Sequence, residues 1–178
     1  MAQIRMVSGT DTARILQIDH NVQADGRGTV LDADQLPSQL EVATRIDALF
    51  AAQAAGRACT MLVAETAEGV VGYAHRQALF PARIAHVGIL DLSVDPAHQR
   101  QGHGRALMEA IIADSWEWGL LRLELYVRAD IHRAIALYRS LGFAHEATRH
   151  GFIRLADGRL VDDHIFCLWN PEAGRGSG

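Results

Sequence analysis

The stretch from residue 90 to residue 108, LDLSVDPAHQRQGHGRALM, is the feature that most limits what this chain can fold into. Apolar residues lead to an Asp-Pro pair, then to two glycines, Gly102 and Gly104, and then to a helix-compatible segment. Amide N–H groups at a helix N-terminus carry positive partial charge, and glycine lets an anion approach the backbone. Arg100 and Arg105 add formal positive charge on either side. The stretch therefore predicts a strand, a phosphate-binding turn and a helix.

Two other phosphate-binding turns do not fit this stretch. The chain has no G-x-x-x-x-G-K-[ST] segment, which argues against a nucleoside triphosphatase. The dinucleotide-binding pattern G-x-G-x-x-G fails because Leu107 stands three residues after Gly104. A helix start whose glycines serve only packing is the plain alternative, and the charged residues around the glycines favour an anion site over it.

Hydrophobic periodicity assigns the other elements. Alternating polar and apolar residues predict strands, and apolar residues spaced by three and four predict helices. The expected strands are 3–7, 58–65, 70–79, 85–94, 122–127, 144–152 and 160–168, and the expected helices are 12–22, 38–55, 104–118 and 131–141. This order indicates the α/β (α+β) class, with a mixed, largely antiparallel central sheet of about seven strands flanked by about four helices. Residues 1–171 are expected to form a single domain, followed by a disordered tail at 172–178.

Length and charge narrow the function classes. A chain of 178 residues fits one domain that can bury a core without disulfides or metals. Its 21 Asp and Glu outnumber its 17 Lys and Arg, which argues against a nucleic-acid-binding domain. Cys59 and Cys167 each lie in an apolar run and are expected to be buried thiols in a reducing cytoplasm. No signal peptide or membrane span is apparent, so a cytoplasmic protein without a membrane partner is expected.

The nine histidines do not suggest a metal site. His98 and His103 are separated by a turn, and no H-x-x-x-H or C-x-x-C pair accompanies them. Zinc sites use tighter ligand spacing. We therefore expect no bound metal.

The segment QRQGHG, residues 99–104, matches Q/R-x-x-G-x-G/A, the signature of the GNAT superfamily of N-acetyltransferases. The resemblance implies acetyl-CoA as co-substrate, with the pantetheine arm meeting the backbone of Leu92 and Val94. It also implies a backbone site for the pyrophosphate of coenzyme A. The residues of that site would be Gln99, Arg100, Gly102, His103, Gly104 and Arg105.

A second block, RAIALYRSLGF at residues 133–143, is similar to the A-x-x-L-Y-x-x-x-G-F segment of the same superfamily. Within that resemblance, Tyr138 contacts the cofactor and is the acid that protonates the departing CoA thiolate. An ordinary half-buried aromatic residue is the alternative. One departure concerns Ile131, which stands where many members have an asparagine that contacts the cofactor. The cofactor arm is therefore expected to lose one polar contact there, unless Asp130 or His132 replaces it.

The implied reaction is direct acetyl transfer to a primary amine, with a main-chain N–H of residues 90–94 as the donor to the thioester oxygen. The general base is left open. Asp91 and His86 on one expected strand and Glu124 on the next are candidates, each with a solvated or hydrogen-bonded strand residue as its alternative. Glu124 is expected on the opposite face of its strand from Leu123 and its alternate neighbours.

Two segments, at residues 23–37 and 150–163, indicate the kind of acceptor. Residues 150–163 resemble bacterial members that acetylate free amino acids or phosphinothricin-like analogues. The loop at 23–37 and the last hairpin should form the acceptor wall of a partly enclosed pocket, which favours a small-molecule amine. A protein N-terminal or lysine acetyltransferase and a non-catalytic acyl-CoA-binding module are the alternatives. The resemblance also makes a homodimer an expectation.

Overall fold

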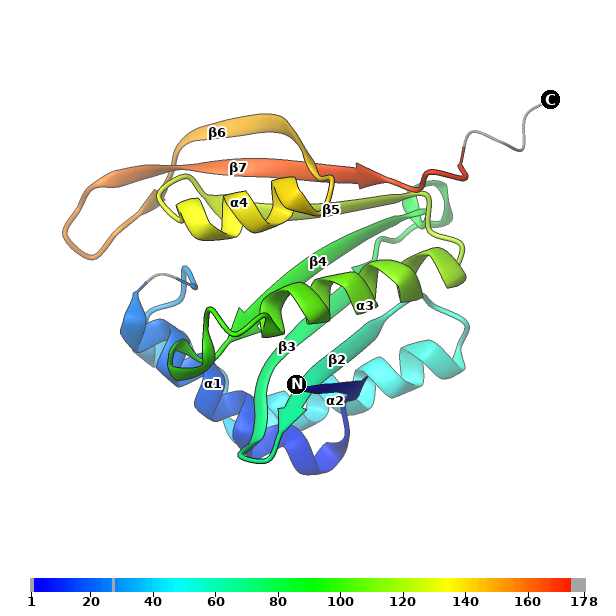
Figure 1. Cartoon of the computed structure of the whole chain (residues 1–178), viewed down its shortest axis with the longest axis horizontal. Coiled ribbons are helices and arrows are strands. Elements are labelled where there is room, and N and C mark those ends of the chain that lie inside the picture. Colours follow the sequence, from blue (N-terminus) through cyan, green and yellow to red (C-terminus); the bar gives the residue numbers. More distant parts are fainter. Residues whose placement is uncertain (1, 27, 174–178) are drawn as a thin grey trace.

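The computed structural model describes residues 2–26 and 28–173, which contain one seven-stranded sheet in the order β1-β2-β3-β4-β5-β7-β6 (Figure 1). Neighbouring strands are antiparallel except β4 and β5, which are parallel. The predicted mixed, largely antiparallel sheet is therefore confirmed. The strands are β1 (Gln3–Met6), β2 (Thr60–Thr66), β3 (Gly69–Ala78), β4 (Val87–Val94), β5 (Arg122–Arg128), β6 (Ala144–Arg154) and β7 (Leu160–Trp169).

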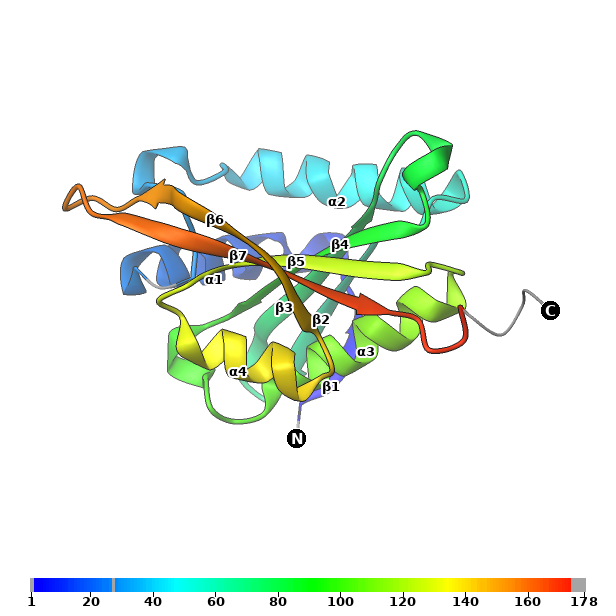
Figure 2. The ribbon, with the colours of Figure 1, turned by 90° about the horizontal axis from the view of Figure 1, so that it is seen from above.

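Four α-helices cover the two faces of this sheet. Figure 2 shows α1 and α2 on one face and α3 and α4 on the other. The helices are α1 (Thr12–Asp25), α2 (Gln39–Ala54), α3 (His103–Glu117) and α4 (His132–Ser140), and short 3-10 turns occur at Gly9–Asp11, Ala33–Gln35, Ala82–Ile84 and Pro96–His98. None of the helices within the described ranges is long and apolar enough to cross a bilayer.

Each face of the sheet carries its own apolar core. Ile15, Ile18 and Ile46 of α1 and α2 pack on one face, and Leu107 and Ile111 of α3 pack on the other, all fully buried. Burying one such side chain contributes roughly 1.5–3 kcal/mol. The two cores therefore hold α1 and α2 on one face of the sheet and α3 on the other.

The β4 and β5 strands diverge at the centre of the sheet. Only Val87, Gly88 and Ile89 of β4 pair with β5, whereas β4 continues to Val94 and remains paired with β3 along that length. Across the described residues, the β5-facing edge of residues 90–94 has no strand partner. Apart from the Val94 carbonyl, which accepts a hydrogen bond from the Gln99 side chain, backbone groups on that edge are thus open to an extended ligand.

Several boundaries differ from the sequence predictions. The expected loop at 23–37 is helical as far as Asp25, because α1 ends only at Gly26, which adopts the left-handed φ of 70° that suits a helix terminus. The strand expected from residue 85 begins at Val87 after a 3-10 turn. Cys59, expected to be buried, is partly exposed, while Cys167 is buried. Most of the expected tail, residues 174–178, lies outside the described residues.

Candidate active site

A cavity of about 1130 Å³ opens where β4 and β5 separate. Its lining includes residues 90–94 of β4 and 126–128 of β5. The turn before α3 and residues of α4 as far as Tyr138 line one side, and residues from α1, α2 and β3 line the other. The cavity therefore passes between the strands and reaches both faces of the sheet.

The turn before α3 has the backbone shape of an anion site. Arg100 has a φ of 62° and Gly102 a φ of 85°, so two nearby residues adopt left-handed conformations. Such turns point backbone N–H groups in one direction, and the first amides of a helix lack intrahelical acceptors. A Cβ added at Gly104 would lie 3.6 Å from side-chain atoms of Leu92 and Val94, an ordinary contact. The residues present thus fit a phosphate group at the start of α3.

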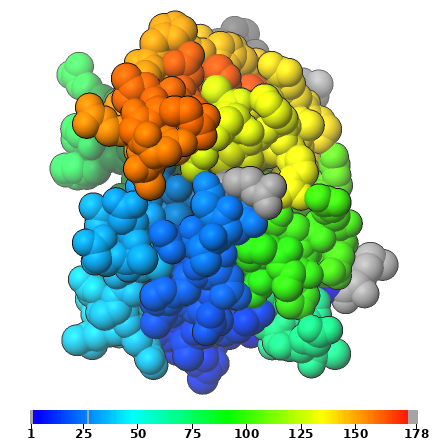
Figure 3. Space-filling view, turned by 90° about the vertical axis from the view of Figure 1, so that its left-hand side faces the viewer, coloured from blue at the N-terminus to red at the C-terminus, as the bar shows by residue number. Residues whose placement is uncertain are grey.

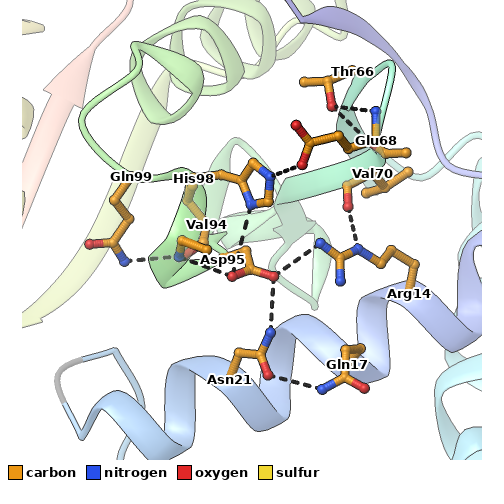
Figure 4. A network of polar contacts seen from close by, with 12 residues as sticks. Arg14, Gln17, Asn21, Thr66, Glu68, Val70, Val94, Asp95, His98 and Gln99 are labelled. Carbon is orange, nitrogen blue, oxygen red and sulfur yellow. Dashed lines mark hydrogen bonds and ion pairs between the residues drawn. The ribbon is translucent and has the colours of Figure 1, made fainter.

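Buried polar contacts fix the beginning of this turn (Figure 4). Asp95, only 3% exposed, accepts hydrogen bonds of 3.0 Å from Arg14 and from Asn21, both on α1. It also accepts a 3.1 Å bond from the backbone N–H of Ala97. The Nε2 atom of His98 lies 3.0 Å from a carboxylate oxygen of Glu68. The turn is therefore held to α1 and to the β2–β3 hairpin before any ligand arrives.

The polar side chains that the sequence assigned to the pyrophosphate site have other contacts as well. Gln99 donates to the carbonyl of Val94 at 3.1 Å and accepts from Arg133 of α4 at 2.8 Å. Arg105 donates to Ser140 at 2.6 Å. These two residues link the turn and α3 to α4, so the backbone amides and Arg100 are the groups of this set best placed to meet an anion. His103 is 8% exposed, and its Nε2 atom has no hydrogen-bond partner among the described residues.

Tyr138 reaches the cavity from α4. The side chain is 8% exposed and packs edge-on against Phe143, with ring centroids 6.1 Å apart. Burial, and next the negative charge of Asp91, raise the pKa of the phenol well above its usual value. Tyr138 therefore keeps its proton at neutral pH. Ile131, just before α4, also lines the cavity.

The three base candidates lie in different surroundings. Asp91 lines the cavity, with a side chain 73% exposed. Glu124 does not line it, and its carboxylate accepts hydrogen bonds from Arg122 at 2.8 Å and from Tyr126 at 2.9 Å. His86 is also absent from the lining. The structure thus brings Asp91 to the site of Tyr138 and places the other two candidates elsewhere.

The side of the cavity lined by α1, α2 and β3, called the acceptor side below, contains residues that the sequence did not predict. On β3, Tyr73 lies opposite Ser93 of β4, and His75 lies opposite Asp91. Tyr73 donates a 2.5 Å hydrogen bond to Asp19 of α1. Burial raises the pKa of the Asp19 carboxyl. The sequence indicates that Tyr73 and His75 share one face of a strand, but no local pattern shows which residues of β4 they lie opposite.

An aromatic and charged cluster forms the far wall of this side. The Arg149 guanidinium pairs with Asp163, which is 3% exposed, and lies over the rings of Phe152 at 3.8 Å and Tyr126 at 4.7 Å. Figure 3 shows the β6–β7 hairpin, in orange, directly above the segment that follows α1, in blue. Thr29, Val30 and neighbouring residues of that segment line the cavity too. Both of the expected acceptor walls therefore border the cavity.

No group of three or more side chains of the metal-ligating types occurs together in residues 2–26 and 28–173. The cavity is instead lined by carboxylates, guanidiniums, imidazoles and phenols. These groups can hold anions and ammonium ions and can move protons.

Comparison with known proteins gives concordant results. A family model described as the acetyltransferase (GNAT) family matches residues 30–143. A [ribosomal protein bS18]-alanine N-acetyltransferase of Escherichia coli strain K12 is 45% identical over 71 residues, which are 40% of this chain and 48% of that protein. The chain thus spans about half the length of the curated relatives it matches.

Solved structures share the whole fold. A GNAT-family acetyltransferase from Streptococcus pneumoniae aligns with a TM-score of 0.86 at 22% identity, covering 96% of this chain and 100% of that one. A phosphinothricin acetyltransferase from Sinorhizobium meliloti in complex with acetyl-CoA aligns with a TM-score of 0.86 at 22% identity, covering 98% and 91%. At these identities the likeness concerns the fold.

Proposed function

The chain belongs to the acetyltransferase (GNAT) family, and we propose that it transfers the acetyl group of acetyl-CoA directly to a primary amine, a small molecule such as an amino acid. The observation that carries this proposal is a single cavity that joins an anion-binding turn to a polar chamber through the gap between β4 and β5. A reaction between a phosphate-bearing donor and an amine needs both compartments and a passage between them.

The turn before α3 would hold the donor. Backbone amides from Arg100 to Gly104 would bind the pyrophosphate, with the Arg100 guanidinium beside them, and the open edge of β4 at Leu92 and Val94 would pair with the pantetheine arm. When bound, acetyl-CoA supplies a thioester, whose carbonyl accepts an amine and whose sulfur leaves as a thiolate. A main-chain N–H of residues 90–94 would stabilise the oxygen as it gains charge.

Tyr138 is the proposed acid. A thiolate must receive a proton before it attacks the new amide, and a buried phenol that keeps its proton at neutral pH is a suitable donor. Asp91 lies on the opposite side of the gap and is the proposed carboxylate of the acceptor side. Glu124 is left out of this assignment because it does not line the cavity and its carboxylate accepts hydrogen bonds from Arg122 and Tyr126.

The acceptor chamber supports a small substrate. Residues 28–31 on one side and Phe152 with Arg154 on the other border it, and it contains both carboxylates and guanidiniums. An amino acid carries an ammonium group that can pair with these carboxylates and a carboxylate that can pair with these guanidiniums. An α-amine with a pKa near 8 is also roughly a tenth neutral at pH 7, whereas a lysine-type amine is only about a few parts in ten thousand neutral. An α-amine is therefore easier for the general base to deprotonate than a lysine-type amine.

A second candidate acceptor is the N-terminal amine of a protein. The Escherichia coli relative is named for the alanine of ribosomal protein bS18, and the 71 matched residues are 45% identical. This acceptor is also an α-amine, so the cofactor side and the proton transfers would be the same. The two candidates differ in whether the chamber admits a chain beyond the first residue.

An acceptor panel tests the proposal. Purified protein, acetyl-CoA and a thiol-detecting reagent are mixed with free amino acids, with polyamines, and with peptides that have free or acetylated N-termini. We expect thiol release with free amino acids, and none with acceptors whose amine is already acetylated. Faster release with free-amine peptides would make the protein N-terminus the substrate. If acetyl-CoA raises the melting temperature but no amine releases thiol, the chain is a binding module and the proposal is overturned.

A further inference from the structure

His75 and Asp91 form a pair across two adjacent strands. They lie directly opposite each other in the antiparallel β3–β4 ladder, which puts both side chains on the same face of the sheet. The Nδ1 atom of His75 is 3.9 Å from Oδ2 of Asp91. This spacing exceeds a direct hydrogen bond, yet it lets the carboxylate stabilise an imidazolium.

Both members of the pair face the acceptor chamber. Each lines the cavity, and the His75 side chain is 20% exposed whereas that of Asp91 is 73% exposed. Tyr73, two residues before His75, belongs to the core under α1 and α2, so this face of β3 is the one away from α3. The pair therefore lies on the far side of the β4–β5 gap from the anion-binding turn.

An imidazole suits proton removal here better than a carboxylate. Model-peptide imidazoles titrate near pH 6.5 and aspartates near 3.9, while an α-ammonium titrates near 8. A base works best when its pKa is near the operating pH, because it is then both unprotonated and basic enough. A carboxylate alone lies roughly four units below the ammonium, so proton transfer to it is strongly uphill.

Other charged groups share the chamber and have their own partners. Asp19 of α1 accepts the hydroxyl of Tyr73 and lies 3.9 Å from Arg45 of α2. Arg128 of β5 pairs with Asp130. On β2, the residue opposite His75 is the apolar Met61. Asp91 is thus the carboxylate placed to act on His75.

We propose that His75 is the general base of the reaction and that Asp91 positions and stabilises its protonated form. This inference rests on the proposed acetyl transfer. One proton passes from the acceptor ammonium to His75, and the freed lone pair forms the N–C bond to the acetyl carbon. The C–S bond breaks, and the sulfur takes the proton of Tyr138. The second amine proton reaches the tyrosinate, directly or through solvent, and restores the phenol. His75 returns its proton to solvent.

The pH dependence of a His75→Gln variant tests the assignment. Without the imidazole only the neutral fraction of the α-amine reacts, so kcat/KM should fall about tenfold near pH 7. The loss should shrink towards pH 9, where the amine is already neutral. A loss that is equal at all pH values, or no loss, would show that His75 has no base role. Calorimetric titration with acetyl-CoA should give the same affinity as the wild type.

Controls separate this inference from the proposed function. His145→Gln removes an imidazole on β6 that does not line the cavity, and it should leave the pH profile unchanged. The wild type supplies an independent measurement. Its kcat/KM should increase with pH at pH values well below the pKa of the acceptor amine. A wild-type profile that follows only the amine titration overturns the base role even if the variants do not fold. If the wild type acetylates nothing, the proposed function itself fails, and this assignment fails with it.

Discussion

The carboxylate of Asp95, at the end of β4, accepts a 3.0 Å hydrogen bond from the guanidinium of Arg14 on α1. Arg14 also donates to the carbonyl of Val70 at 2.7 Å, so one side chain joins α1, the β2–β3 hairpin and the turn that leads to α3. Asp95 is almost fully buried, and a buried carboxylate is stable only when donors surround it. The turn before α3, the proposed anion site, is therefore built on an internal polar network.

Asp95→Ala should both destabilise the protein and weaken its binding of acetyl-CoA. The change removes a buried acceptor and leaves donors on Arg14 and Asn21 without it, which costs about 2–4 kcal/mol. Urea denaturation measures the first effect and calorimetry the second. Glu68→Ala is the matched control, because its carboxylate contacts the same turn through His98 but is 77% exposed and should change stability by less than about 1 kcal/mol. Equal effects of the two variants would contradict the role assigned to Asp95.

Asp114→Ala should destabilise the protein more than its partial exposure suggests. Arg76 of β3 is 0% exposed, and its guanidinium lies 2.5 Å from the Asp114 carboxylate of α3. Removing the carboxylate leaves a buried cation with only neutral partners, at a cost of about 3–5 kcal/mol.

Arg76→Met is the informative comparison, because an apolar side chain of similar length removes the buried charge itself. We expect it to cost clearly less than Asp114→Ala in urea denaturation. If Arg76→Met destabilises the protein more than Asp114→Ala does, the attraction within the ion pair, rather than the cost of an unpaired buried charge, determines the loss of stability. Glu109→Ala, which removes an exposed i,i+4 partner of Arg105 on α3, should be nearly neutral.

The turn before α3, the proposed anion site, could be located from the sequence because the residues that form it are local. Two glycines, two arginines and a helix start fall within a short run, and in the structure α3 begins at His103, between the two glycines. The alternation in β5 was equally local: Leu123 and Leu125 are buried, while Tyr126 is 42% exposed. Where neighbours in the chain determine the environment, the pattern was sufficient.

The acceptor side could not be predicted in the same way, since strand pairing brings its residues together. His75 and Asp91 are opposite each other only because β3 and β4 share one register. The gap beside β4 arises because pairing with β5 stops at Ile89, and no local pattern marks that position. Arg76 is a further example, since a strand arginine is ordinarily exposed and this one is fully buried.

The two glycines of the turn should respond differently to alanine. Gly102 has a φ of 85°, so Gly102→Ala forces a left-handed conformation and should cost about 1–2 kcal/mol in urea denaturation. Gly104→Ala introduces a methyl group with ordinary contacts at 3.6 Å and should leave the fold intact. A large loss of stability from Gly104→Ala would contradict this reading.

Gly104→Asp tests the anion site itself. The aspartate should fold as the Gly104→Ala variant does, because both place a Cβ in the same space. It should weaken acetyl-CoA binding at least tenfold, since its carboxylate repels the pyrophosphate and competes for the helix N-terminus. Calorimetric titration at two salt concentrations measures this, and the deficit should narrow at the higher salt. Unchanged affinity would place the phosphates elsewhere.

Asp11→Asn should lower stability in a pH-dependent way. Hydrogen bonds from Arg5 are the main cause that holds the pKa of Asp11 below its usual value. The folded chain then takes up this proton less readily than the unfolded chain, whose aspartates titrate near 3.9. The ionised carboxylate therefore stabilises the fold above about pH 4, and that stability is lost as the pH falls through the folded value.

Urea denaturation of the wild type and Asp11→Asn at several pH values tests this linkage. The difference should be about 1–2 kcal/mol at pH 7 and should shrink below about pH 4. Asp157→Asn removes an exposed carboxylate whose partner, among the described residues, is Arg159 in its own hairpin turn, and it should change stability little at any pH. A constant difference for Asp11→Asn across the range would show that packing, not charge, is responsible.

Tyr138→Phe should abolish most turnover without loosening the cofactor. The variant keeps the buried ring and its edge-on contact with Phe143 but removes the hydroxyl of a side chain that lines the cavity. If the phenol protonates the departing sulfur, kcat should fall about 10²–10³-fold while the affinity for acetyl-CoA stays within about twofold. Trp169→Phe is the control, because this exposed ring does not line the cavity and its change should leave kcat nearly unchanged. Unaltered turnover in Tyr138→Phe would remove the acid role, and a parallel loss of affinity would assign the hydroxyl to binding.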